Sequence, residues 1–261
     1  MKIREVVEAL EQLAPLPLQE DWDNAGVQVG LTEAEVSGVL LCLDVTESII
    51  DEAIGKGCNL VVSHHPLLFH GLKRIGDGTH VERSVSKAIR AGITVVAMHT
   101  NMDNALGGVN YRIASKLGMT DISFIGEKSV GDVKCGSGVI GTLPDKMDSK
   151  AFIHKVKETF GVECAMCNRL MDGDISRVAI CGGAGDFLLD QAMSMGADAF
   201  ITGEMHYHNF FGNEGKIQIC VIGHYQSEQY TSEIFLEAIS RRYPALPAYI
   251  AETNTNPIIY I

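Results

Sequence analysis

The chain has 261 residues and a formal net charge of −12, with 46% apolar and 21% charged residues. This length and composition are those of a globular protein that can bury a substantial core. The acidic balance argues against a nucleic-acid-binding protein that relies on charge, because such a protein needs a basic surface. No uninterrupted apolar run approaches the length of a membrane span.

The first predicted element is an amphipathic helix over residues 1–15, whose charges are not those of a secretory signal peptide. The seven cysteines lie mostly inside apolar runs, as reduced and buried thiols do in cytoplasmic proteins. Cys164 and Cys167 form one C-x-x-C pair without a second, so we assign them to the core. We therefore expect a cytoplasmic protein without a membrane segment.

From residue 39 onward, short apolar runs alternate with helical stretches: a strand at 39–43, a helix at 47–57 and a strand at 59–63. This alternation predicts an α/β fold around a largely parallel sheet. The same strand–helix–strand pattern recurs without gaps when residues 39–65 are aligned with 178–204. The identical pairs are Val39/Val178, Cys42/Cys181, Asp51/Asp190, Ala53/Ala192 and Gly57/Gly196.

Any two β-α-β units look alike, so these identities alone leave chance similarity open. A second recurrence favours duplication, because His99-x-x-x-Asp103 and His224-x-x-x-Glu228 follow a later strand in each half. We expect two similar α/β halves, residues 1–125 and 126–261, related by internal duplication. The segment between them contains no low-complexity linker, so we expect the halves to pack as one compact unit.

Four predicted strands end in side chains that bind metal ions. They are His64 and His65; His99 and Asp103; Glu204, His206 and His208; and His224 and Glu228. Open α/β sheets bind ligands at the carboxyl ends of their strands, and imidazole and carboxylate suit Zn, Mn or Fe. Pro66 ends the strand after two adjacent histidines, which favours two ions side by side, about 3.5–4 Å apart. Glu228 or Asp103 is the candidate bridging carboxylate.

Other residues near these strand ends leave alternatives open. His99 is either a hydrogen-bonded residue that orients Asp103 or a catalytic or ligand residue. Glu204, His206 and His208 lie where the repeat places His65, and either line the site or lie on the surface.

Two further segments are equally open. His70, Lys73 and Arg74 belong either to a solvated loop or to a site for an anionic substrate. Trp22, Asp23 and Asn24 fit a turn or helix cap as well as a functional role.

Five motifs together resemble the GTP cyclohydrolase 1 type 2 homologue family, a dinuclear-metal group also described as transcription-factor-interacting. They are DWDNAGVQVG (21–30), SHHP (63–66), HTNMDNALGGVN (99–110), TGE (202–204) and GHYQSE (223–228). The chain resembles the compact form of this family, which lacks an inserted domain. The resemblance implies two similar α/β halves, a dinuclear site in the cleft between them, and a ring-shaped hexamer.

The resemblance also implies roles for single residues. His64 and His224 would bind one ion, His65 and Asp103 the other, and Glu228 would bridge both. The implied activity is that of a hydrolase in which a metal-activated water attacks a nucleotide-type substrate such as GTP, with a nearby histidine, for which we name His99, as general acid or base. The alternative is a metal-stabilised, ring-shaped binding or scaffold protein without catalysis. The sequence leaves the native metal and the physiological substrate open.

Overall fold

The computed structural model describes all 261 residues and divides them into two compact units. The first consists of Met1–Ala105 and Thr231–Pro257, and the second of Leu106–Tyr230 and Ile258–Ile261. This division differs from the predicted halves, which broke at residue 125 and gave the whole C-terminal region to the second half. The difference arises because the last long helix and the last strand return to the first unit, which local sequence patterns do not reveal.

The first unit is built on a five-stranded sheet in the order β1-β4-β3-β2-β13. The strands are β1 (Gly26–Val29), β2 (Val39–Cys42), β3 (Leu60–Ser63), β4 (Thr94–Ala97) and β13 (Ala248–Ile250). All neighbours run parallel except β1, which pairs antiparallel with β4 at the edge. A central parallel sheet needs cover on both faces, and β2, β3 and β4 are accordingly buried along their full length.

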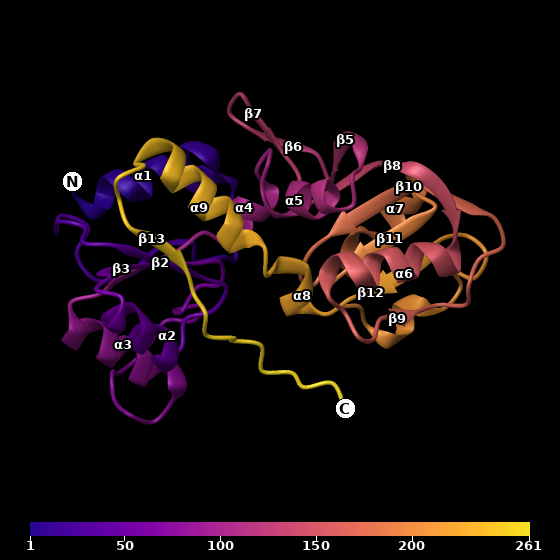
Figure 1. Ribbon diagram of the computed structural model, residues 1–261. Coiled ribbons are helices and arrows are strands. Elements are labelled where there is room, and N and C mark those ends of the chain that lie inside the picture. The colour runs from indigo at the N-terminus through magenta and orange to yellow at the C-terminus, as the bar shows by residue number, and fades with distance from the viewer. The chain divides into compact units, whose positions relative to one another are not determined.

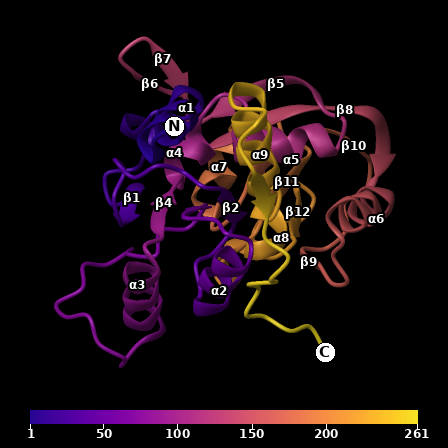
Figure 2. The ribbon, with the colours of Figure 1, turned by 60° about the vertical axis from the view of Figure 1, so that its left-hand side comes forward.

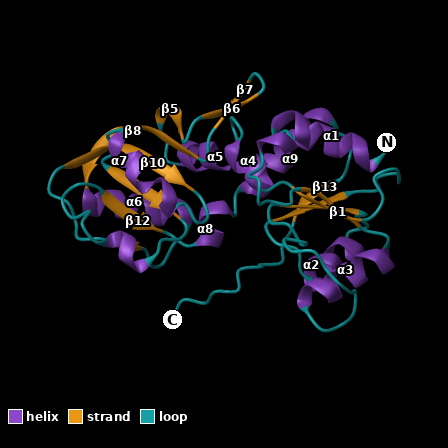
Figure 3. Ribbon diagram, turned by 180° about the vertical axis from the view of Figure 1, so that it is seen from behind, coloured by secondary structure: helices purple, strands orange, loops and turns teal.

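Helices supply that cover (Figures 1 and 3). One face carries α1 (Ile3–Leu13) and α9 (Thr231–Arg242), and the other carries α2 (Glu47–Gly55) and α3 (His80–Ala91). Side chains on a strand alternate between the faces, so Leu40 and Cys42 join the core beneath α2 and α3. Short helices η1 (Leu16–Leu18) and α4 (Thr100–Asn104) complete the unit.

The second unit contains a six-stranded sheet in the order β5-β8-β10-β11-β12-β9. The strands are β5 (Thr120–Ile125), β8 (Gly138–Asp148), β9 (Met166–Cys167), β10 (Asp174–Cys181), β11 (Ala199–Thr202) and β12 (Gln218–Val221). A hairpin of β6 (Lys128–Val130) and β7 (Val133–Cys135) stands away from this sheet (Figures 1 and 2). The helices are α5 (Val109–Lys116), α6 (Ser149–Phe160), η2 (Asp186–Leu188), α7 (Leu189–Ser194), η3 (Tyr207–Phe210) and α8 (His224–Glu228).

The α/β fold class is thus confirmed, and the two aligned segments have the same local architecture. Val39 pairs with Leu60, and Val178 pairs with Ala199, in both cases between parallel strands. The two residues of each pair are 21 positions apart in the chain (60 − 39 and 199 − 178). Leu40 and Cys42 face α2, and their aligned partners Ala179 and Cys181 face α7. The predicted equivalence of strand direction is therefore confirmed. Duplication itself stays an interpretation.

The second recurrence, the His-x-x-x-acid pattern, follows a later strand in both units, but its register differs by one residue. Ser63 pairs with Ala97 and its aligned partner Thr202 pairs with Val221. His99 lies two residues after Ala97 and precedes α4, whereas His224 lies three residues after Val221 and begins α8. The same spacing therefore occupies different helical positions in the two units.

No helix of the chain combines the length and the apolar character that crossing a bilayer requires.

Candidate metal centre

His64 follows β3 directly and is fully buried. Its Nδ1 lies 2.9 Å from the carbonyl oxygen of Met98. A carbonyl can only accept, so Nδ1 carries the proton and Nε2 keeps its lone pair. This Nε2 lies 3.6 Å from Oδ1 of Asp103, close to the ~3.4 Å between two ligands each about 2.1 Å from a tetrahedral ion. The distance suits one ion held by His64 and Asp103, and the expected pairing of Asp103 with His65 stays a prediction.

His65 is held by a carboxylate that sequence reasoning missed. Its Nδ1 lies 2.7 Å from Oδ1 of Asp44, whose other oxygen accepts the Thr255 hydroxyl at 2.8 Å. Burial disfavours the charge of Asp44, but the hydrogen bond and charge of His65 outweigh it and lower the pKa of that carboxyl below its ordinary value. A carboxylate on one ring nitrogen fixes the tautomer and makes the other nitrogen a stronger ligand.

His99 follows β4 and is oriented by the N-terminal motif. Its Nδ1 lies 2.7 Å from Oδ1 of Asp23, and Oδ2 of Asp23 accepts the backbone N–H of Thr100 at 3.0 Å as well as its hydroxyl. Burial opposes ionisation here too, yet the hydrogen bonds from His99 and Thr100 bring the pKa of Asp23 down to about 2. Asp23 therefore orients the ring of His99 through Nδ1, and the expected role of His99 in orienting Asp103 stays a prediction.

The three histidines of the first unit converge. His64, His65 and His99 each offer one ring nitrogen, and these atoms lie within 4.8 Å of one another. Their rings meet edge to face or tilted, with centroids 4.9–5.5 Å apart. Two strand ends that are 35 residues apart in the chain (99 − 64) therefore deliver one imidazole cluster, because β3 and β4 are adjacent and parallel.

In the second unit, His224 lies between two carboxylates. Its Nδ1 is 3.0 Å from Oε1 of Glu204, which follows β11, and its Nε2 is 3.1 Å from Oε2 of Glu228. With Nδ1 on Glu204, a neutral imidazole leaves Nε2 as the ligand atom, and metal binding requires this neutral form. Glu228 is buried, and it fits only because Gly183 has no side chain: a Cβ there would lie 2.4 Å from Oε1 of Glu228.

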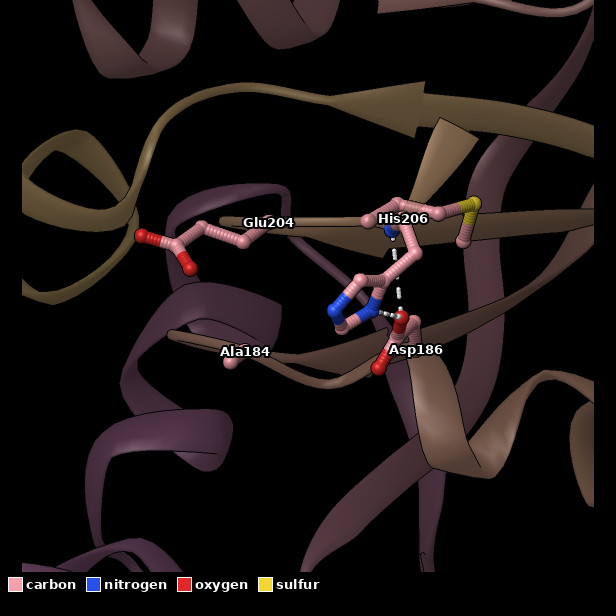
Figure 4. A pocket seen from close by; sticks show the side chains of 5 residues that line it. Ala184, Asp186, Glu204 and His206 are labelled. Atoms are coloured by element: carbon pink, nitrogen blue, oxygen red, sulfur yellow. Dashed lines mark hydrogen bonds and ion pairs between the residues drawn. The ribbon is translucent and has the colours of Figure 1, made fainter. Parts of the chain in front are cut away.

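His206 lies in a pocket of the same unit that is lined by Ala184, Asp186, Glu204 and Met205 (Figure 4). Oδ2 of Asp186 lies 2.5 Å from its Nδ1 and also accepts its backbone N–H. The hydrogen bond with Asp186 raises the pKa of His206 above its ordinary value. Glu204 thus lines this pocket while holding His224.

The remaining candidates belong to none of the groups of side chains that could hold a metal ion. His208 is a residue of η3, and its ring packs against the rings of Tyr207 and Phe211. Lys73 and Arg74 are exposed in the loop between β3 and α3, and the nearby ring of His70 packs on Phe69. All seven cysteines are free, including Cys164, which is exposed rather than in the core as expected.

Replacing Asp44, whose carboxylate holds Nδ1 of His65, tests whether Asp44 supports metal binding. We expect Asp44→Ala to weaken zinc binding roughly 10–100-fold, the usual cost of losing such a partner. Competition with a chromophoric chelator measures the affinity. Asp51→Ala is the matched control, since Asp51 is an exposed aspartate of the same unit that pairs only with Lys87. Equal zinc affinity in the two variants would show that Asp44 does not act on the metal.

Comparison with known proteins shows which family the chain belongs to. The model of the family Duf34/NIF3 (NGG1p interacting factor 3) matches residues 1–257. A GTP cyclohydrolase 1 type 2 homolog of Clostridium acetobutylicum is 32% identical over 229 residues, covering 87% of this chain and 85% of the relative. Another, from Campylobacter jejuni, is 30% identical over 262 residues and covers all of both chains.

The fold comparison leads to the same group. The crystal structure of the Staphylococcus aureus hypothetical protein SA1388 matches with a TM-score of 0.91 and 27% identity, covering 100% of this chain and 99% of that one. The family match spans both units and includes every histidine and carboxylate described above, and the predicted family resemblance is thereby confirmed. The chain belongs to the Duf34/NIF3 family.

Proposed function

We propose that this protein is a dinuclear metal-dependent hydrolase that acts on a nucleotide-type substrate. One observation carries the proposal: the rings of His64, His65 and His224 each have Nδ1 held by a protein oxygen. Buried or half-buried imidazoles fixed in this way present Nε2 as a ligand, and such outer partners are typical of metal sites. Packing alone gives no reason for three strand-end histidines to share the arrangement.

Five residues form the proposed ligand set. His64 and Asp103 would hold one ion, which their 3.6 Å contact supports. His65 and His224 would hold the other, and Glu228 would bind both. Each ion has three protein ligands in this assignment, which leaves positions open for water and substrate, as catalytic sites do. The donors are imidazole and carboxylate, so Zn, Mn and Fe are the candidate metals.

When bound, two divalent ions supply Lewis acidity that makes water a nucleophile at neutral pH. The chain's own residues handle the protons. Asp23 accepts a hydrogen bond from Nδ1 of His99 and keeps its charge because its pKa is about 2. The ring of His99 is thereby oriented with Nε2 directed away from Asp23, where it takes a proton from the attacking water or gives one to the leaving group.

The names of the relatives support a nucleotide-type substrate, and GTP is the first one to test. We also propose a homohexamer, on the family resemblance, and a cytoplasmic location, since seven free thiols suit a reducing compartment.

The test combines metal counting with turnover. We expect native mass spectrometry of the protein reloaded with Zn or Mn to give two ions per chain and the mass of six chains. Turnover on a panel of nucleotides, GTP included, should disappear with a chelator and return with the metal. One ion per chain after reloading would contradict the dinuclear assignment.

The same experiment separates the hydrolase from the alternative function. A fully loaded protein that turns over no nucleotide would indicate a metal-stabilised binding or scaffold protein. Chelation of such a protein would change its assembly mass or stability without affecting any reaction.

A further inference from the structure

Trp22 is the only tryptophan of the chain, and 62% of its surface is exposed. Its ring lies beside that of Phe69, which is 43% exposed, with centroids 5.9 Å apart and planes tilted by 56°. Large aromatic side chains contribute most to stability when buried. Two that remain together at the surface therefore indicate a binding role.

The two rings are held in place from both sides. Asp23, the residue after Trp22, accepts hydrogen bonds from His99 and Thr100. Asn24 donates from Nδ2 to the carbonyl of Leu68 at 2.7 Å, next to Phe69. Binding surfaces built on pre-positioned rings lose little conformational entropy on binding.

The rings of Trp22 and Phe69 both contact His99, a member of the imidazole cluster of the first unit. The ring centroid of His99 lies 6.1 Å from that of Trp22 and 6.2 Å from that of Phe69, with both contacts edge to face. A flat molecule stacked on this pair would lie beside the ring of His99, which belongs to the imidazole cluster. The aromatic pair therefore lies next to His99, the proposed general acid or base, within the first unit.

We propose that Trp22 and Phe69 form a stacking platform for the planar heteroaromatic base of the substrate. Aromatic side chains bind bases through their faces with little regard to base identity. Two side chains are too small an area for a stable protein interface, which needs roughly 800 Å² from each partner. The proposal rests on the proposed function for its nucleotide substrate and adds the residues that bind the base.

The experiment uses the full chain reloaded with metal. Guanosine and GTP should quench the fluorescence of Trp22, after correction for light absorbed by the base, whereas inorganic tripolyphosphate should not. Calorimetry supplies the affinities. We expect Trp22→Ala and Phe69→Leu to weaken guanosine binding roughly 5–150-fold, the range for loss of one base–aromatic stack. Trp22→Phe, which keeps an aromatic face, should retain most of the affinity.

Phe187→Leu is the matched control, because Phe187 is 65% exposed and lies in the second unit. Unchanged guanosine affinity in both Trp22→Ala and Phe69→Leu would overturn the platform. Equal quenching by tripolyphosphate, no binding of guanosine or GTP to the unmodified chain, or a change in assembly mass alone would also overturn it. The last result would assign the pair to contacts between chains.

Metal content and GTP turnover of the same samples separate this proposal from the proposed function. Base binding that depends on Trp22, without turnover, keeps the platform and removes the hydrolase. Chelator-sensitive turnover with normal base affinity in the variants keeps the hydrolase and removes the platform.

Discussion

Glu228→Gln should remove most of the metal from the protein. A bridging carboxylate neutralises charge on two ions at once, and the amide keeps its shape but loses the charge. We expect metal affinity to fall by more than the roughly 10–100-fold that loss of an orienting partner costs. His99→Ala should stay within that range, because the structure places His99 beside the ligands with its Nδ1 on Asp23. Ion counts per chain after reloading with Zn or Mn measure both effects.

Glu214→Gln controls for the loss of one negative charge, since Glu214 is an exposed residue of the same unit. Equal metal loss in Glu228→Gln and His99→Ala would make His99 a ligand in its own right. Full loading of Glu228→Gln would place the bridge elsewhere, with Asp103 as the next candidate.

Gly203→Ala should damage both stability and metal binding. A Cβ at Gly203 would lie 2.7 Å from the carbonyl oxygen of Gly183 and 2.9 Å from Cα of His224, so backbone atoms must move. Overpacking of this kind costs about 1–3 kcal/mol of the free energy of unfolding, and occasionally more. The movement displaces the start of α8, which carries His224 and Glu228. Urea denaturation and zinc titration measure the two losses.

Gly55→Ala is the control for adding a methyl group. Gly55 ends α2 with nothing within 4 Å of a Cβ, so alanine should be neutral or stabilise by up to about 1 kcal/mol. Wild-type stability and zinc affinity in Gly203→Ala would show that the close approach of β11 and α8 is not required for the site.

The sequence determined the local parts of this protein. His64 and His224 each come after a strand that is buried along its full length. The mostly apolar runs before these two histidines predicted both the buried strands and the chemistry at their ends. The aligned pairs Val39/Val178 and Cys42/Cys181 predicted two β-α-β units of equal strand direction. These predictions succeed because hydrophobic periodicity and residue type act within a few residues along the chain.

Only the tertiary structure decided which groups support the ligands. Asp44 reaches His65 across 21 residues and Asp23 reaches His99 across 76, and no local pattern encodes such contacts. The same holds for residues 231–257, which return to the first unit. The one-residue offset between His99 and His224 depends on where each helix starts after its strand, because packing sets the register of a helix while the spacing in the sequence stays the same. The tertiary structure thus brought His99 to Asp23, and Asp103 to within 3.6 Å of His64.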